Sequence, residues 1–332
     1  MSLDAPSAPI AVLGGSGFIG TRLVGRLIEL GLNPRIVDLQ PSRLFPDRYL
    51  PCDVRKADTL RTVLSGASAL INLAAEHRDD VRPVSRYHET NVEGARQVCL
   101  AATKAGIRIL IFTSSVAVYG FQPIPVDESG PFQPFNPYGE TKLLAESIYR
   151  AWAEEDPART LVILRPTVVF GEGNRGNVYN LLRQIATGRF MMVGPGTNKK
   201  SMAYVENVAE ALIHSLTLGP GTHIFNYVDT PDMDMNELVA LVNRTLERSD
   251  STHWRIPLAL AMAGGHALDG LARVTGRNFP ISTIRVRKFT ENTQFIAARV
   301  QASGFTPRFS LHEGLIRTMA KEFQVGPGSN GS

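Results

Sequence analysis

Tyr138 and Lys142 lie four residues apart in the stretch NPYGETK (136–142), so a helix would carry both side chains on one face, one turn apart. Such a pair can move a proton, because a lysine cation favours the phenolate of a tyrosine whose free pKa is about 10. The stretch is also typical of a helix start, since Asn136 suits the N-cap and Pro137 the first helical position. Taken alone, the pair could be ordinary helix surface, so its interpretation depends on the rest of the chain.

A glycine-rich run, VLGGSGFIGTRL, places Gly14, Gly17 and Gly20 between an apolar strand and an amphipathic helix. Gly14 suits a tight turn, Gly17 lets a diphosphate approach backbone N–H groups, and Gly20 lets the helix pack closely on the sheet. The helix N-terminus adds its positive end. The run therefore predicts a dinucleotide-binding loop, with a glycine turn that binds no ligand as the alternative.

Two acidic residues end the strands that follow. Asp38 is placed to accept a hydrogen bond from an adenosine ribose hydroxyl, which favours NAD over NADP because a carboxylate would repel a ribose phosphate. Arg43, five residues later, leaves NADP open. Asp53 ends the third predicted strand, where it could reach the adenine ring or cap the next helix.

Apolar runs alternate with amphipathic segments up to about residue 170. The predicted strands are 10–14, 35–38, 49–54, 69–75, 108–115 and 160–166, and the predicted helices include 21–30 and 89–106. This alternation predicts an α/β fold, a Rossmann-type doubly wound parallel sheet. After Gly171 the pattern breaks into short pieces, so we expect an NAD-binding domain over 1–172, a smaller and partly interleaved α/β substrate lobe over 173–325, and a flexible tail over 326–332.

Composition narrows the classes of function. The 332 residues are 43% hydrophobic and 20% charged, which is typical of a soluble globular chain. The net charge of +4 is scattered, so nucleic acid is not expected as a partner, and the cysteines, Cys52 and Cys99, lack metal-ligand neighbours and fit a reducing cytoplasm. The longest apolar run, LALAMAGG (258–265), is too short to span a bilayer. We expect it to form a buried helix, with interfacial contact as the less favoured alternative and no stable membrane insertion.

Motifs in a fixed order give the chain a family resemblance. They are GGSGFIG (14–20), Asp38, DV (53–54), NLAA (72–75), NVEG (91–94), SSVAVYG (114–120), PYGETK (137–142) and RP (165–166). In this order they resemble the extended short-chain dehydrogenase/reductases, and within them the NAD-dependent epimerase/dehydratase family that acts on nucleotide sugars. The resemblance covers nearly the whole chain.

The resemblance implies a catalytic set of Ser115, Tyr138 and Lys142. Ser115 would hydrogen-bond the substrate oxygen, and Lys142 would also hold the nicotinamide ribose. The cofactor implied is NAD, and no metal is expected. The cofactor-binding residues implied by the matching motifs are Gly14, Gly17, Phe18, Ile19, Gly20, Asp38, Asp53, Val54, Leu73, Ala74, Ala75, Tyr138 and Lys142.

The residues after Ser115 narrow the reaction. Val116 and Ala117 stand where the family's dehydratases carry acids, and neither side chain can transfer a proton. The resemblance then implies 4-epimerisation of a UDP-hexose or UDP-N-acetylhexosamine in surface polysaccharide precursor synthesis. Tyr138 would take the C4 hydroxyl proton while NAD takes the hydride, and both would return to the opposite face of a 4-keto sugar. A 4-dehydrogenase or 4-ketoreductase is the closest alternative, and a non-catalytic NAD-binding protein is a more distant one.

The substrate side is described by single residues. Asn177 could bind a diphosphate or sugar oxygen, Lys200 stands where relatives commonly hold a phosphate-binding arginine, and Arg285 or Arg287 would supply a second phosphate contact. His77 follows the fourth strand and could shape the sugar site, although a hydrogen-bonded loop histidine is the simpler interpretation. The family also implies a homodimer formed through the helix that bears Tyr138 and its neighbour at 89–106.

Overall fold

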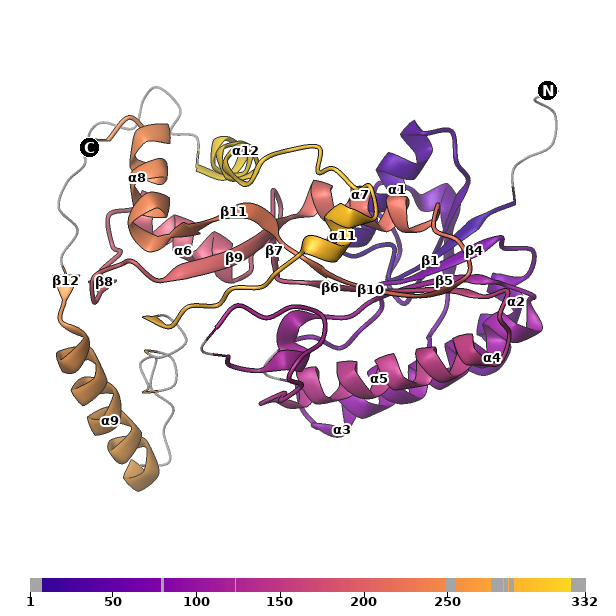
Figure 1. Cartoon of the computed structure of the whole chain (residues 1–332), viewed down its shortest axis with the longest axis horizontal. Helices are drawn as coiled ribbons and strands as arrows, with labels where there is room; N and C mark the ends of the chain where they lie inside the picture. The colour runs from indigo at the N-terminus through magenta and orange to yellow at the C-terminus, as the bar shows by residue number, and fades with distance from the viewer. Residues whose placement is uncertain are drawn as a thin grey trace.

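The structure, a computed structural model, describes residues 8–78, 81–122, 124–248, 255–275, 283, 286 and 290–323. Its centre is a seven-stranded parallel sheet in the order β10-β6-β5-β4-β1-β2-β3 (Figure 1). The strands are β1 (Ile10–Leu13), β2 (Pro34–Asp38), β3 (Tyr49–Pro51), β4 (Ala69–Asn72), β5 (Ile109–Thr113), β6 (Thr160–Pro166) and β10 (Gly221–Tyr227). β1 and β4 to β6 are buried along almost their whole length, because helices cover both faces of the sheet.

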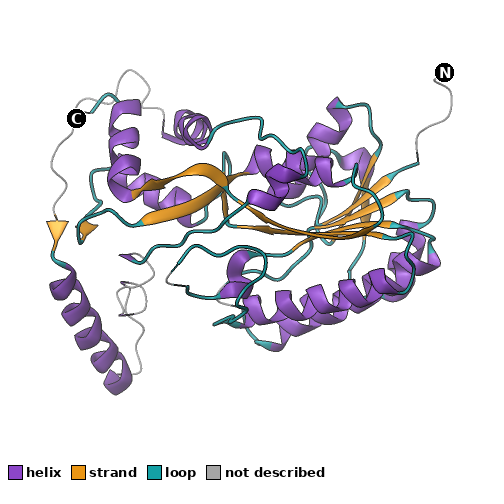
Figure 2. Cartoon of the chain, in the orientation of Figure 1, coloured by secondary structure: helices purple, strands orange, loops and turns teal. Residues whose placement is uncertain are grey.

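Two helical layers enclose this sheet, as Figure 2 shows. One face packs on α2 (Ala57–Leu64), α4 (Gly94–Lys104) and α5 (Pro137–Glu154), and the other on α1 (Phe18–Glu29), α7 (Val205–Ser215) and α11 (Ala298–Ala302). A separate apolar core lies on each side of the sheet. The predicted Rossmann-type doubly wound sheet is confirmed.

A second, smaller lobe is built on a three-stranded sheet of β7 (Val168–Phe170), β9 (Lys199–Tyr204) and β11 (Asp229–Asp234). Around it pack α6 (Asn177–Ala186), α8 (Met235–Thr245) and α12 (Leu311–Phe323), which share a third apolar core. A two-stranded pair, β8 (Met192–Val193) and β12 (Arg255–Ile256), lies at the far end of this lobe (Figure 1).

The two lobes are interleaved along the chain. After β7 and β9 of the small sheet, α7 packs on α1 and β10 pairs with β6 of the central sheet. The chain then enters β11 and returns to the small lobe. Residues 173–248 thus contribute to both lobes.

The helix predicted over 89–106 begins earlier and is not uniform. The short α3 (Ser85–Tyr87) leads into a π-helical segment, η2 (His88–Glu93), and then into α4. Wide helical turns of this kind occur often at functional sites. Two short 3-10 segments, η1 (Pro46–Arg48) and η3 (Val116–Tyr119), follow β2 and β5.

The apolar run 258–265 forms the start of α9 (Leu258–Thr275), and here the prediction of a buried helix is wrong. Among the residues of α9 whose side chains the structure describes, only Gly265 is buried, whereas Leu260 is 65% exposed. The core of the small lobe closes without α9, which projects from the body beyond β12 (Figure 1). Over the described residues, no helix combines the length and the apolar character that crossing a membrane would require.

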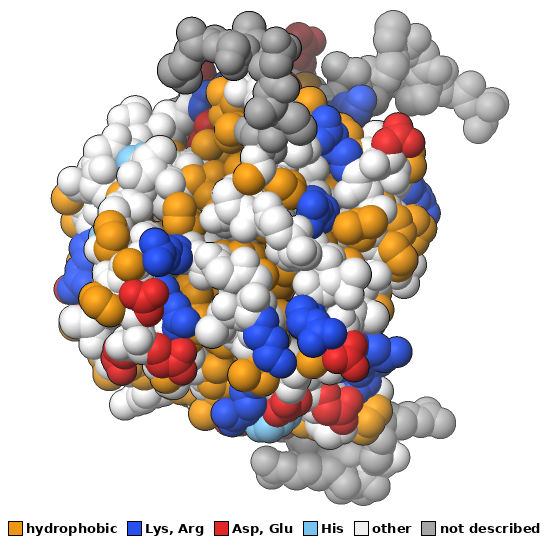
Figure 3. Space-filling view, turned by 90° about the vertical axis from the view of Figure 1, so that its right-hand side faces the viewer, with side chains coloured by type: hydrophobic (Ala, Val, Ile, Leu, Met, Phe, Trp, Pro, Cys, Tyr) orange, Lys and Arg blue, Asp and Glu red, His pale blue; other side chains and the backbone are white. Residues whose placement is uncertain are grey.

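Charge is mixed on the face of the molecule that forms the right-hand side of Figure 1. In Figure 3, basic and acidic side chains are interspersed between apolar ones over the described residues. This face therefore presents no continuous basic surface among the residues drawn in colour.

Candidate active site

A cavity of about 680 Å³ lies at the carboxyl ends of the central strands, beside the first residues of the small lobe. Ligands of doubly wound sheets bind at this edge. Most of the predicted site residues line it together: Gly14, Gly17, Phe18, Ile19, Gly20, Asp38, Asp53, Val54, Leu73, Ala74, Ala75, His77, Ser115, Tyr138, Lys142 and Asn177.

The glycine loop forms the floor of this cavity. Gly14 has a φ of +76°, a left-handed conformation that favours glycine. A Cβ on Gly20 would stand 2.4 Å from the Gly14 carbonyl oxygen, so only glycine lets α1 begin this close to β1. A Cβ on Gly17 would touch nothing except that same carbonyl, at 3.2 Å, so its absence keeps the loop open to a ligand. The free N–H groups of the first turn of α1 face an anion at such a site.

Asp38 joins the loop to the end of β2. Its carboxylate accepts hydrogen bonds from the Ser16 N–H at 3.0 Å and the Gln40 N–H at 3.1 Å. Each oxygen keeps a lone pair for a ribose hydroxyl. Arg43, which left NADP open, is exposed and does not line the cavity.

Asp53 has a partner that the sequence did not reveal. The Arg55 guanidinium donates to both carboxylate oxygens at 2.7 to 3.0 Å and holds the pKa of Asp53 below its usual value. The alternative role as a helix cap is not observed, because Lys56 is the N-cap of α2. Arg55 also lines the cavity and brings a cation to it beside Asp53.

The start of α5 sets the positions of Tyr138 and Lys142. The Asn136 side chain accepts from the Gly139 N–H at 2.9 Å, as the predicted N-cap, and Pro137 is the first helical residue. Lys142 is 2% exposed, and its Nζ donates to the Thr113 carbonyl at 2.7 Å and lies 5.9 Å from the Tyr138 ring centroid. Burial lowers the pKa of Lys142 to about 7, and the Glu146 carboxylate opposes this shift. A Tyr138 phenolate would in turn favour the cationic form of Lys142.

Ser115 stands directly after β5. Its Oγ accepts from the Ala117 N–H at 3.1 Å, which makes it the N-cap of η3. This bond uses the hydroxyl as an acceptor and leaves its proton free to be donated to a substrate oxygen. The preceding Ser114 instead donates to Glu146 at 2.6 Å, behind the cavity.

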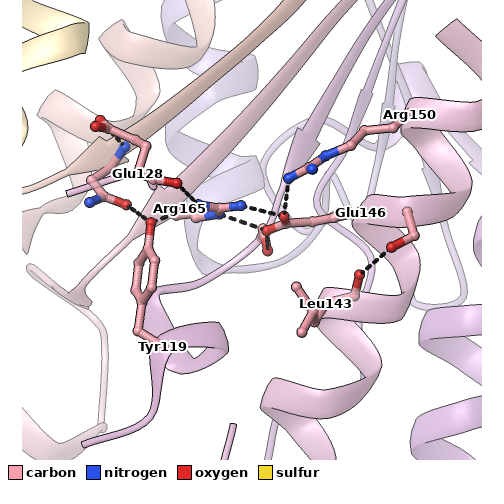
Figure 4. Close-up of polar contacts among 9 residues, drawn as sticks. Tyr119, Glu128, Leu143, Glu146, Arg150 and Arg165 are labelled. Carbon is pink, nitrogen blue, oxygen red and sulfur yellow. Dashed lines mark hydrogen bonds and ion pairs between the residues drawn. The ribbon is translucent and has the colours of Figure 1, made fainter. Parts of the chain in front are cut away.

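A buried ion pair supports the site from behind (Figure 4). Glu146, one turn after Lys142 on α5, accepts two hydrogen bonds from Arg165 at 2.8 and 2.6 Å. Arg165, fully buried, also donates to the Tyr119 hydroxyl at 2.6 Å and the Glu128 carbonyl at 3.1 Å. The sequence motif that contains Arg165 did not reveal its partner. The position of Glu146, one helical turn after Lys142, could have indicated a buried carboxylate behind the catalytic pair.

Asn91, from the NVEG motif, fixes the loop after β4. It accepts from the Glu76 N–H at 2.8 Å and donates to the Glu76 carbonyl at 3.0 Å and to Thr141 on α5 at 2.9 Å. The Glu76 carboxylate lines the cavity and forms an ion pair with Arg86 at 3.1 Å. The sequence analysis identified neither Glu76 nor Arg86 as part of the site.

The residues present fit a dinucleotide such as NAD. The missing Cβ at Gly17 keeps the loop open beside the first turn of α1, and both Asp38 oxygens keep a lone pair. Thr113 and Thr167 also line the cavity, although their Oγ1 atoms are closed to solvent and have no hydrogen-bond partner in the described part of the chain.

Among the described residues, none of the cations predicted to bind phosphate lines this cavity. Lys200 donates to the Glu291 carbonyl and to Thr293 at 3.0 Å, and burial lowers its pKa to about 8. It does not line the cavity. Arg285 and Arg287 lie outside the described residues.

Comparison with known proteins agrees with this geometry. Residues 10–227 match the model of the NAD dependent epimerase/dehydratase family. The chain belongs to that family. The predicted family and the NAD-dependent epimerase activity are thereby confirmed, and NAD is its cofactor.

Individual relatives give a finer picture. The chain is 47% identical over 95% of both chains to the N-acetyl-alpha-D-glucosaminyl-diphospho-ditrans,octacis-undecaprenol 4-epimerase of Escherichia coli O157:H7. It is 26% identical to a UDP-glucose 4-epimerase of Streptococcus mutans, over 92% of this chain and 94% of the relative. Among solved structures, MoeE5 in complex with UDP-glucuronic acid and NAD is 25% identical, with a TM-score of 0.72 over 94% of this chain and 98% of that one.

Proposed function

We propose that this epimerase inverts C4 of an N-acetylhexosamine held through a diphosphate on a polyprenol carrier, in the synthesis of polysaccharide precursors. The observation that carries the proposal is the 47% identity, over 95% of both chains, to an epimerase of that substrate. Relatives named for UDP-sugars are 24 to 32% identical.

A UDP-linked hexose or hexosamine is the second candidate, and it was the carrier predicted from the sequence. It is supported by the fold shared with MoeE5, which was solved with UDP-glucuronic acid. Both candidates present a sugar diphosphate to the cavity; they differ beyond the second phosphate and, for a plain hexose, also at C2 of the sugar. The reaction at C4 is therefore argued once for both.

NAD, when bound, accepts a hydride from C4 and returns it. The glycine loop with the first turn of α1 would hold its diphosphate, Asp38 its adenosine ribose, and Lys142 its nicotinamide ribose. Tyr138 takes the proton of the C4 hydroxyl and later gives it back, which is the role of a general base and acid. Lys142 beside it favours the phenolate, and Ser115 donates a hydrogen bond to the C4 oxygen.

The proposed chemistry needs only the set of Ser115, Tyr138 and Lys142. No acidic residue directly follows Ser115. The described acids lining the cavity are Asp38, Asp53 and Glu76; Asp53 and Glu76 are paired with arginines, and Asp38 accepts two N–H groups. This arrangement supports oxidation and re-reduction at one carbon over removal of a hydroxyl group. A net 4-oxidoreductase would need free exchange of its cofactor with solvent.

The substrate test offers the purified protein three compounds: the polyprenyl diphosphate of N-acetylglucosamine, UDP-N-acetylglucosamine and UDP-glucose. We expect the galacto product from the first and little or none from the other two, with no added NAD required. Mass spectrometry of ligands released on denaturation should show NAD. Turnover of only the UDP-sugars would select the second candidate, and a requirement for added NADH would select the oxidoreductase.

Tyr138→Phe tests the catalytic assignment. Because the phenol is the proposed proton carrier, we expect a loss of at least about a hundredfold in kcat with NAD still bound. Tyr179→Phe is the matched control, since Tyr179 packs on Phe323 outside the cavity. Equal activity in both variants would remove Tyr138 from the mechanism.

Two further features belong to the proposal. We infer a homodimer formed through α4 and α5, where Leu100 and Leu144 are 55% and 49% exposed on helices that pack together. We place the chain in the cytoplasm, where its two buried free cysteines would stay reduced. Sedimentation equilibrium of the wild type and of Leu144→Glu tests the dimer, and a monomeric wild type would exclude it.

A further inference from the structure

An apolar helix stands outside both lobes. α9 projects from the end of the small lobe, and its leucines Leu258, Leu260 and Leu271 are 42%, 65% and 47% exposed. Between Leu258 and Ala272 the sequence holds one charged residue, Asp269. The Asp269 carboxylate accepts from the Thr283 N–H at 3.1 Å, so it is already engaged. Leu260 and Leu271 fall on one face of the helix with Gly264 and Ala267 between them, and all four are exposed. An exposed apolar face of this kind marks an interaction site.

The opposite side of the start of α9 attaches the helix to the small lobe. β12, which leads into α9, pairs with β8, and the Leu258 Cβ would lie 3.9 Å from a Cβ at Gly194 just after β8. Met191, the residue before β8, is itself 55% exposed. The exposed face formed by Leu260, Gly264, Ala267 and Leu271 is what we call the α9 surface.

Positive charge is concentrated in α9 and the sequence that follows it. Residues 255–288 contain six basic residues and one acidic residue, a net charge of +5, while the whole chain carries +4. The rest of the chain is therefore nearly neutral. Arg255, at the entry to α9, and Arg189, two residues before Met191, are both exposed. A helix that combines exposed leucines with basic neighbours suits an anionic lipid surface.

We propose that the α9 surface docks the enzyme on an anionic membrane, with its leucines among the lipid tails and the net positive charge of the segment 255–288 attracting the headgroups. The inference rests on the proposed polyprenol-linked substrate, which resides in such a membrane. α9 lies on the same side of the sheets as the start of α5, which carries Tyr138 (Figure 1). With α9 on the membrane, the catalytic pair would therefore lie on the side of the molecule that faces the membrane, where the polyprenol-linked sugar diphosphate is held.

Vesicle binding by the full-length, NAD-loaded protein tests the proposal. We expect it to sediment with vesicles of phosphatidylcholine and phosphatidylglycerol in equal parts, and more weakly with phosphatidylcholine alone. Leu260→Glu and Leu271→Glu should each weaken binding by about tenfold or more, because each leucine would no longer be buried in lipid. Leu44→Glu is the matched control, since Leu44 is 68% exposed in the NAD-binding lobe and should bind as the wild type does.

A soluble assay separates this inference from the proposed function. N-acetylglucosamine diphosphate on a short, water-soluble prenyl chain should be epimerised equally by the wild type and the two α9 variants. Absence of this turnover in the wild type would count against the proposed function, whatever the vesicles show. A wild type that stays in the supernatant, or α9 variants that bind vesicles like the wild type, would overturn the docking proposal. So would a change of oligomeric state in the α9 variants without loss of vesicle binding, because the surface would then contact a second copy of the chain.

Discussion

At the scale of single residues, Gly20 offers a sharp test of the cofactor loop. A Cβ there would lie 2.4 Å from the Gly14 carbonyl oxygen, a backbone atom that cannot move aside cheaply. Gly20→Ala should displace the loop and lower the NAD content of the purified protein by about tenfold or more, because the loop would no longer fit a diphosphate. Gly25→Ala, on the same helix, is the control, because its Cβ would meet only the tip of Phe45 at 3.5 Å. An unchanged NAD content in Gly20→Ala would refute this role of the loop.

Residues whose chemistry depends on local spacing were predictable. The turn Gly14–Gly20, the N-cap Asn136 and the pair Tyr138 and Lys142 depend on neighbours in the sequence, and the structure places them around one cavity. Arg55, Glu76 and Arg86 were not identified, because their contribution depends on which strand ends meet. Lys200 shows the reverse case. It stands where relatives commonly hold a phosphate-binding arginine, yet the structure does not place it in the cavity.

At the scale of the element, α5 is fixed to the sheet by the buried pair of Glu146 and Arg165. Removing one partner leaves the other charge buried and unpaired, so Glu146→Leu or Arg165→Met should each cost about 3–5 kcal/mol of unfolding free energy. The double variant should lose clearly less than the sum of the two. Urea denaturation of all four proteins measures this coupling. Glu29→Gln, in the exposed pair with Arg26, is the control and should cost at most about 1 kcal/mol; additive losses at Glu146 and Arg165 would contradict the coupling.

The positions of the helices and strands were easier to predict from the sequence than the extent to which each of them is buried. The six strands predicted up to residue 166 all exist, because each is a compact apolar run between turns. α9 was predicted to be buried because its sequence is rich in leucine and alanine. Such a run is buried, however, only if another surface covers it. In the described chain, the third core is completed by α6, α8 and α12, so α9 remains outside. The π-helical segment before α4 leaves no sequence signal that periodicity could detect.

At the scale of the whole molecule, the two lobes meet at Asp229. This residue follows β10 of the central sheet and opens β11 of the small lobe. Its carboxylate accepts from the Tyr204 N–H at 2.6 Å, from Asn207 on α7 at 2.9 Å and from the Tyr227 hydroxyl at 2.8 Å. Asn207 in turn donates to the Phe309 carbonyl at 2.7 Å, so the junction includes the segment that leads into α12. The sequence could not predict this crossing, because it depends on β10 returning to the central sheet.

The titration of Asp229 makes this junction sensitive to pH. Burial raises its pKa from 3.8 to about 6, against the hydrogen bonds that favour the carboxylate. Between these two values the folded state binds more protons than the unfolded one, so the unfolding free energy contributed by Asp229 falls as pH rises from about 4 to 6 and then stays low. The fall should approach about 3 kcal/mol. In Asp229→Asn this titration is absent, so the unfolding free energy of the wild type minus that of the variant should decrease across the same pH range. Urea denaturation of both proteins from pH 4 to 7 measures it, and a pH-independent difference would show that the pKa of Asp229 is the same in the folded and unfolded states.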